Sequence, residues 1–257
     1  MRASLPMYDW PEIAGETDAA WAALSPILRA RGIAAPDGLD RTGGFGAHWP
    51  APDLCLSMAC GLDVAEGRTA PSRTVARPVW RFRAWPAGTY RSALVTRMAE
   101  AAKPLATLAR RPVINMAESW SGAACLERHL AGRDIALGRP HVSGSHRASL
   151  ECIRQGDADL AAIDGVSLAL AARFDGIDDI AILGWTAPAA ATPMIAGAAL
   201  DPARVLAALH RWERTDAFRS WADAIGLTGF MPASETDYGS MSKPLPHGFI
   251  FRQETVT

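Results

Sequence analysis

The stretch Ser143-Gly144-Ser145-His146-Arg147-Ala148-Ser149 is the part of the sequence that most clearly indicates the fold. It follows a strand-like segment, residues 139–142, and precedes a helix-like run, residues 150–154, that ends at Gly156. A strand that leads into a helix through Ser and Gly presents backbone N–H groups and hydroxyls at the positive end of the helix dipole. This is the outline of an anion site, in which His146 can donate and change charge near neutral pH. A second interpretation stays open, in which Ser143 or Ser145 is an N-cap and His146 a surface residue.

The same alternation of strand, polar turn and helix recurs along the middle of the chain. A strand at 112–115 is followed by a turn at 118–122 and a helix at 123–130. Another strand, at 159–163, leads through 164–167 into a helix at 168–174, and a further strand follows at 180–186. Strands that alternate with helices in this way predict an α/β protein with parallel sheets and helices on both faces.

The remaining elements are predicted from hydrophobic spacing and from Gly and Pro. The expected strands lie at 3–7, 53–58, 75–82 and 90–97. Helices are expected from Thr17 to Gly32, at 202–212 and at 216–225, and the tail at 229–246 is expected to be loop-rich.

Ligands of parallel α/β sheets bind at the carboxyl ends of the strands. The serine turns at 119–122 and 143–146 fall at that edge, as do Tyr8, Ser57 and Asp164. The sequence therefore predicts one site that collects these residues. Asp164, at a strand end, is equally suited to be a helix N-cap.

Composition excludes several classes of protein. The 257 residues are 49% hydrophobic with a formal net charge of −1, so neither a nucleic acid nor a membrane surface is an expected partner. Cys55, Cys60, Cys125 and Cys152 form no Cys-x-x-Cys pair, and we expect no metal site, no cofactor and no membrane insertion. No signal peptide is recognisable, which predicts a cytoplasmic protein as the sequence stands, or a periplasmic one if a leader has been removed.

Several motifs together resemble a known family. Ser119-Trp120-Ser121-Gly122 is followed by Ser143-Gly144-Ser145-His146 and by Gly156-Asp157-Ala158-Asp159, an order similar to that in the phosphate/phosphonate-binding proteins of ABC importers. Leu5-Pro6-Met7-Tyr8, Leu56-Ser57 with Cys60-Gly61, and Tyr90-Arg91-Ser92 resemble the short members of that family. The resemblance covers residues 3 to 195.

The resemblance implies a type II periplasmic-binding-protein fold, with two α/β lobes and a ligand cleft between them. Lobe 1 would comprise residues 1–91 and 189–257, and lobe 2 would be the inserted segment 92–188. The two crossovers between the lobes would lie near 90–95 and 185–195.

The family's motifs also imply roles for individual residues. Ser119, Trp120 and Ser121 would offer hydroxyls and amides to an anionic head group, and Ser145 and His146 would face it from the next helix. Tyr90 would close over the ligand, and Asp164 would meet a cationic part of it. The family usually has Ser-Thr-Ser at 119–121, so Trp120 removes a hydroxyl and adds bulk.

The predicted function is that of a solute-binding protein that clamps a small anion, phosphate or a phosphonate, for an ABC permease. Two helix N-termini suffice for this task, and no catalytic residue is assigned. One alternative is a cytoplasmic enzyme on the same fold, of the cofactor-biosynthesis type; His48 and Cys60 are a weak candidate pair for its chemistry. Another is a ligand-sensing module for a protein partner.

Overall fold

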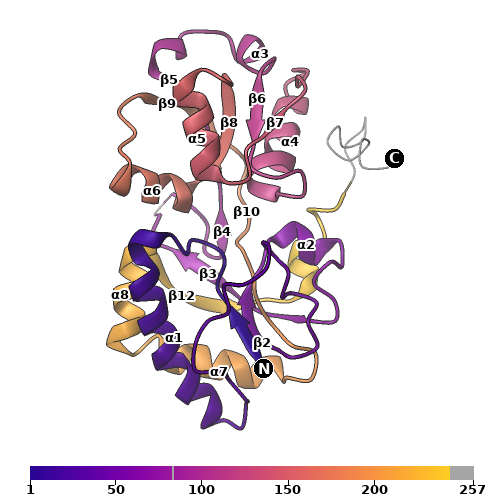
Figure 1. Cartoon of the computed structure of the whole chain (residues 1–257). Coiled ribbons are helices and arrows are strands. Elements are labelled where there is room, and N and C mark those ends of the chain that lie inside the picture. The colour runs from indigo at the N-terminus through magenta and orange to yellow at the C-terminus, as the bar shows by residue number, and fades with distance from the viewer. Residues whose placement is uncertain (83, 244–257) are drawn as a thin grey trace. The chain divides into compact units, whose positions relative to one another are not determined.

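The computed structural model describes residues 1–82 and 84–243 (Figure 1). The chain forms two compact units, one from residues 1–89 and 190–242 and the other from residues 90–189 with Lys243. It passes from one unit to the other through β4 (Thr89–Tyr90) and β10 (Ala189–Ala190), which pair in a two-stranded sheet. Residues 244–257, which the sequence prediction places in lobe 1, lie outside the described residues.

The first unit contains a five-stranded mixed sheet. In spatial order its strands are β1 (Arg2–Ser4), β2 (Leu54–Met58), β11 (Met194–Ala196), β3 (Arg73–Trp80) and β12 (Leu227–Pro232). β1 and β2 are parallel, whereas β11 is antiparallel to both of its neighbours and β12 is antiparallel to β3. The prediction of a wholly parallel sheet is therefore wrong for this unit. Every residue of β2 is buried, as its apolar run predicts.

Three long helices pack in the first unit: α1 (Ala14–Arg29), α7 (Pro202–Trp212) and α8 (Asp216–Ile225). Both C-terminal helices have the bounds that the sequence predicts, because each has a side-chain N-cap, Asp201 and Thr215. Trp212 stacks on Trp221 at 5.3 Å and donates its indole N–H to the carbonyl of Ala20 at 2.9 Å, which fixes α7 against both other helices. The shorter elements are η1 (Pro11–Ile13), α2 (Gly61–Ala65) and η4 (Glu235–Tyr238).

The second unit contains another five-stranded sheet. Its spatial order is β7 (His141–Val142), β6 (Pro112–Ile114), β8 (Leu160–Asp164), β5 (Ser92–Arg97) and β9 (Ile180–Trp185). β7, β6 and β8 are parallel to one another, and β5 is antiparallel to both β8 and β9. The predicted parallel arrangement is thus present in the three strands that precede the polar turns.

The helices of the second unit alternate with the strands of this sheet along the chain. They are η2 (Met98–Glu100), α3 (Leu105–Leu108), η3 (Trp120–Ala124), α4 (Cys125–Ala131), α5 (His146–Gln155) and α6 (Gly165–Phe174). α5 begins four residues before the predicted run at 150–154, so that His146 is its first residue. It ends, as predicted, at Gly156, which adopts the left-handed conformation with φ 80°.

One further expectation can be compared with the structure. The tail predicted as loop, residues 229–246, contains most of β12 and all of η4, so that prediction is wrong for residues 229–232 and 235–238. All four cysteines are thiols, and Cys55, Cys60 and Cys125 are buried. Within residues 1–82 and 84–243, no helix combines the length and the apolar character needed to cross a bilayer.

Candidate functional site

Three helices begin at the same edge of the sheet in the second unit. Because β6, β7 and β8 are parallel, their carboxyl ends lie together, and η3, α5 and α6 start just beyond them. Figure 1 shows α5 lying alongside β8, and the two are in contact. The first amides of a helix have no acceptor within the helix, so this edge gathers backbone donors and the positive ends of helix dipoles.

The first of these starts is a single turn of π-helix, η3, continued by α4. Ser119 is its N-cap, and its hydroxyl accepts a hydrogen bond from the Gly122 amide at 3.1 Å. The hydroxyl oxygens of Ser119 and Ser121 are 3.5 Å apart. Single π turns often occur at functional positions, and here the turn places Ser121 against α5.

His146 connects the first and second helix starts. Its Nε2 lies 2.8 Å from the Ser121 hydroxyl and 3.3 Å from Oδ2 of Asp164, and its side chain is 11% exposed. Burial lowers the pKa of His146, although the Asp164 carboxylate and the Ala162 backbone act to raise it. The ring is therefore neutral at neutral pH in the ligand-free protein, and a charged ring requires an additional negative charge nearby.

Asp164 is the last residue of β8 and the N-cap of α6. One carboxylate oxygen, Oδ1, accepts the amides of Val166 and Ser167, both at 3.0 Å, while Oδ2 faces His146. The side chain is 3% exposed. The N-cap interpretation is therefore confirmed, and both oxygens already have partners within the protein. A contact between Asp164 and a cationic part of a ligand stays a prediction that this burial does not favour.

The site contains the residue types of a hydrolytic triad, in Ser121, His146 and Asp164, but not its geometry. In such a triad the hydroxyl and the carboxylate bind different nitrogens of the imidazole, so that the ring passes a proton between them. Here Ser121 and Asp164 both face Nε2. The arrangement cannot relay a proton across the ring, and it is better suited to holding a ligand than to activating a nucleophile.

The Trp120 side chain packs on the protein interior. It lies against the core cluster of the second unit, which includes Leu108, Ile114 and Leu126, and the Arg128 guanidinium is 5.3 Å from the centre of its ring. This is a cation–π contact. The Trp120 side chain therefore serves packing, and what Trp120 offers at the helix start is its backbone amide.

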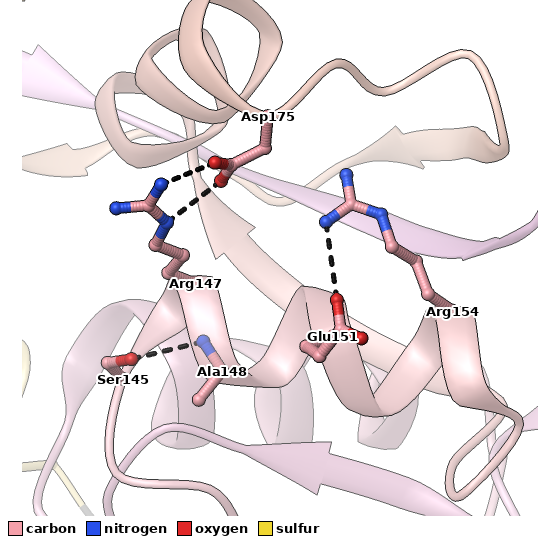
Figure 2. Close-up of a pocket in the computed structure, with 6 residues that line it drawn as sticks. All are labelled: Ser145, Arg147, Ala148, Glu151, Arg154 and Asp175. Atoms are coloured by element: carbon pink, nitrogen blue, oxygen red, sulfur yellow. Dashed lines mark hydrogen bonds and ion pairs between the residues drawn. The ribbon is translucent and has the colours of Figure 1, made fainter.

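Ser145 is the N-cap of α5, and its hydroxyl accepts the Ala148 amide at 3.1 Å (Figure 2). It borders a hollow of about 620 Å³ on the outer face of α5. The two arginines there are paired with acids, Arg147 with Asp175 and Arg154 with Glu151 at 3.7 Å, as Figure 2 shows. Because these charges are neutralised, the hollow itself offers no concentrated positive charge to an anion.

The three other predicted site residues lie elsewhere in the two units. Tyr90, on β4, is 2% exposed. In the first unit, Ser57 is fully buried within β2 and its hydroxyl is 2.9 Å from that of Ser4, so its hydrogen-bonding capacity serves strand pairing. Tyr8 has φ 64° and packs edge-on against Trp80 at 5.4 Å. The ligand roles of these three residues stay predictions.

Sequence reasoning did not single out Gly122. A Cβ at this position would lie 1.9 Å from Oδ1 of Asn115 and 3.2 Å from Cε1 of His146, so only glycine allows these side chains to approach η3. A signal was present in the sequence, since a glycine in a turn after Ser-x-Ser is typical of a position where other groups approach the backbone closely.

Comparison with known proteins bears on what this edge of the sheet does. Residues 59–238 match a family profile described as "ABC transporter, phosphonate, periplasmic substrate-binding protein". The chain belongs to this family. Phosphonate-transporter binding proteins are the substrate-binding components of ABC importers, and a solute-binding role is therefore established for this member. The family resemblance recognised in the motifs is confirmed.

Solved structures agree with the family in fold. PhnD1 from Prochlorococcus marinus, in complex with methylphosphonate, superposes with a TM-score of 0.75 at 15% identity, covering 93% of this chain and 94% of that one. A binding protein of a phosphonate ABC transporter from Pseudomonas aeruginosa has a TM-score of 0.68 at 12% identity, with 93% and 82% covered. A Xanthomonas citri protein bound to ATP has a TM-score of 0.65 at 12% identity, with 93% and 94% covered. No curated protein sequence matches the chain. The predicted two-lobe periplasmic-binding-protein fold is confirmed.

Proposed function

We propose that this phosphonate-transporter binding protein binds a small phosphorus oxyanion, a phosphonate or phosphate, at the starts of η3 and α5. The observation that carries the proposal is the 2.8 Å contact between the Ser121 hydroxyl and Nε2 of His146. It joins two helix N-termini into one surface, on which hydroxyl, imidazole and backbone amide donors converge. Such donors are the usual ligands of phosphoryl oxygens.

The charges around this surface suit a site that binds its ligand without transforming it. Oxyanion binding needs preorganised donors, and Ser119 and Ser145 hold η3 and α5 in place by capping them. The buried neutral ring of His146 can gain a proton when an anion arrives, because the anion's charge opposes the effect of burial on its pKa. We infer that His146 binds the anion as an imidazolium.

The ligands named for two similar proteins are consistent with this class of solute. The Prochlorococcus protein is described with methylphosphonate and the Xanthomonas protein with ATP. Both ligands carry tetrahedral phosphorus with several charged oxygens. The absence of the usual central Thr hydroxyl at Trp120 reduces the number of donors, and we therefore propose a small head group with few oxygens to satisfy.

Membership of the family supports a proposal for the partner and the compartment. We propose that the protein delivers its solute to an ABC permease, and that it does so in the periplasm, where the family works. Fractionation of cells that express the natural gene tests the compartment, and recovery in the cytoplasmic fraction would overturn it. Co-purification with a membrane permease only in the presence of methylphosphonate tests the partner.

A thermal-shift screen tests the binding proposal itself. The ligands are phosphate, phosphite, methylphosphonate, sulfate and benzoate, each at neutral pH, because a ligand that binds only the folded state raises the melting temperature. We expect a rise with a phosphorus oxyanion that is lost in Ser121→Ala and in His146→Ala. Ser242→Ala is the matched control, since its hydroxyl donates a hydrogen bond to the Gly239 carbonyl in the other unit. A rise with benzoate alone, or an unchanged rise in both site variants, would reject the proposal.

A further inference from the structure

Ser121 and Asp164 compete for a single ring nitrogen of His146. The Ser121 hydroxyl is 2.8 Å from Nε2 of His146, and Oδ2 of Asp164 is 3.3 Å from the same atom. A ring nitrogen carries either one proton or one lone pair, and it cannot donate and accept at once. The state of Nε2 therefore decides which way the Ser121 hydroxyl points.

With a lone pair on Nε2, the Ser121 hydroxyl must donate into the ring, and its proton is withheld from any ligand. In that state the ring lone pair also faces the negative oxygen of Asp164, which is unfavourable. With a proton on Nε2, the ring donates to Asp164 and Ser121, and the hydroxyl proton is free to bind an anion. The carboxylate favours the second state.

We propose that Asp164 is a positioning residue, whose carboxylate keeps a proton on Nε2 of His146 and thereby turns the Ser121 hydroxyl towards the anion. This inference rests on the proposed function and concerns the same site. Asp164 acts through His146, because its side chain is 3% exposed and its other oxygen caps α6. A contact between Asp164 and the ligand is not required.

The charged groups around the ring support this assignment. In the part of the chain that the structure describes, Asp164 is the charged group that acts on His146, with Ser121 facing the ring from η3 and the Ala162 backbone from β8. Arg147, the next residue of α5, is paired with Asp175 on the outer face (Figure 2). Burial keeps Cys125, below the site, a neutral thiol by raising its pKa to about 12.

The variant Asp164→Asn separates this role from a structural one. An asparagine retains the carbonyl that caps α6, and Asn and Asp are equally good N-caps, so the fold should be kept. Its amide group, in place of Oδ2, can only donate towards Nε2. The proton should then move to the other ring nitrogen, and the Ser121 hydroxyl should be drawn into the ring.

Two measurements follow. Nitrogen NMR of the His146 ring in the ligand-free protein should show Nε2 protonated in the natural protein and unprotonated in Asp164→Asn. Calorimetric titration with methylphosphonate should show binding about tenfold weaker or more in the variant, the loss expected for one charge-assisted hydrogen bond. If Asp164 merely repelled the anion, or served a cationic ligand group, removing its charge would leave binding unchanged or strengthen it.

Asp175→Asn is the matched control, because it removes the same charge next to the same helix at the outer-face ion pair. We expect it to bind methylphosphonate as the natural protein does. An Nε2 signal that is identical in the natural protein and Asp164→Asn would overturn the positioning role. If the natural protein bound no phosphorus oxyanion, the proposed function would fail, while the ring spectra would still decide the role of Asp164.

Discussion

Replacement of Gly122 by alanine should weaken binding at the proposed site and lower the free energy of unfolding by a predictable amount. The added Cβ would stand 1.9 Å from Oδ1 of Asn115, and the two atoms must separate by roughly 1.5 Å to reach an ordinary contact. Overpacking of a filled interior costs about 1–3 kcal/mol. Because the obstacle is a side chain that can rotate, rather than backbone, we expect about 1–2 kcal/mol, towards the lower end of that range.

Melting experiments and methylphosphonate titration measure this effect. For a chain of this size, 1–2 kcal/mol corresponds to a fall in melting temperature of roughly 2–8 °C. Binding should weaken as well, because the new methyl group also lies 3.2 Å from Cε1 of His146 and pushes the ring away from Ser121.

Gly132→Ala provides the control for this experiment. Gly132 ends α4 with φ −66°, and among the described residues the nearest atom to a Cβ there is the Arg128 carbonyl oxygen at 3.4 Å. An ordinary backbone conformation with room for a methyl group should make this change neutral or slightly stabilising. If Gly122→Ala melted and bound methylphosphonate like Gly132→Ala, the close packing of Asn115 and His146 on η3 would be refuted.

Two other predictions concern titration and thiol reactivity. The pKa of His146 is lower in the folded protein than in the unfolded chain. As the pH falls below about 6.5, the unfolded chain therefore takes up a proton on His146 before the folded protein does. The melting temperature of the ligand-free protein should consequently fall from pH 7 to pH 5. The fall should be smaller in His146→Gln, and an equal fall in both proteins would contradict the neutral buried ring. Thiol reactivity can be followed by alkylation with iodoacetamide and mass spectrometry, and the half-buried Cys152 should be labelled first. Cys55 and Cys125 should be labelled only on unfolding, because both are buried and their pKa values are raised to about 11 and about 12. Early labelling of Cys125 would show that the interior beneath Ser121 opens.

The sequence predicted best where local signals and tertiary structure agree. The bounds of α7 and α8 were predictable because apolar residues recur at helical spacing between a capping residue and, for α8, a glycine in the left-handed conformation. β12 was missed because Gly229 and Pro232 interrupt its pattern. Its strand conformation comes from pairing with β3, far earlier in the chain, where Gly229 pairs with Val79.

The site was predictable in place but not in detail. Polar turns after parallel strands identified the edge at which Ser121 and His146 meet, since strand direction fixes where strand ends gather. The burial of Ser57 and the packing of Trp120 depend on neighbours distant in the sequence, Ser4 and the core of the second unit. The sequence also gave no sign that Asp164 and Ser121 face the same ring nitrogen, because that depends on the angle at which α5 meets β8.

The most direct test of the account is a map of backbone amide chemical-shift changes as methylphosphonate is added to the labelled protein. If the anion is held at the two helix starts, the largest changes in the second unit should fall on the amides of residues 120–122 and 145–147. They should be accompanied by protonation of the His146 ring. Changes in the second unit that concentrate on the outer face of α5, around Arg154 and Asp175, or that leave the Ser121 and His146 amides unmoved at saturation, would contradict it.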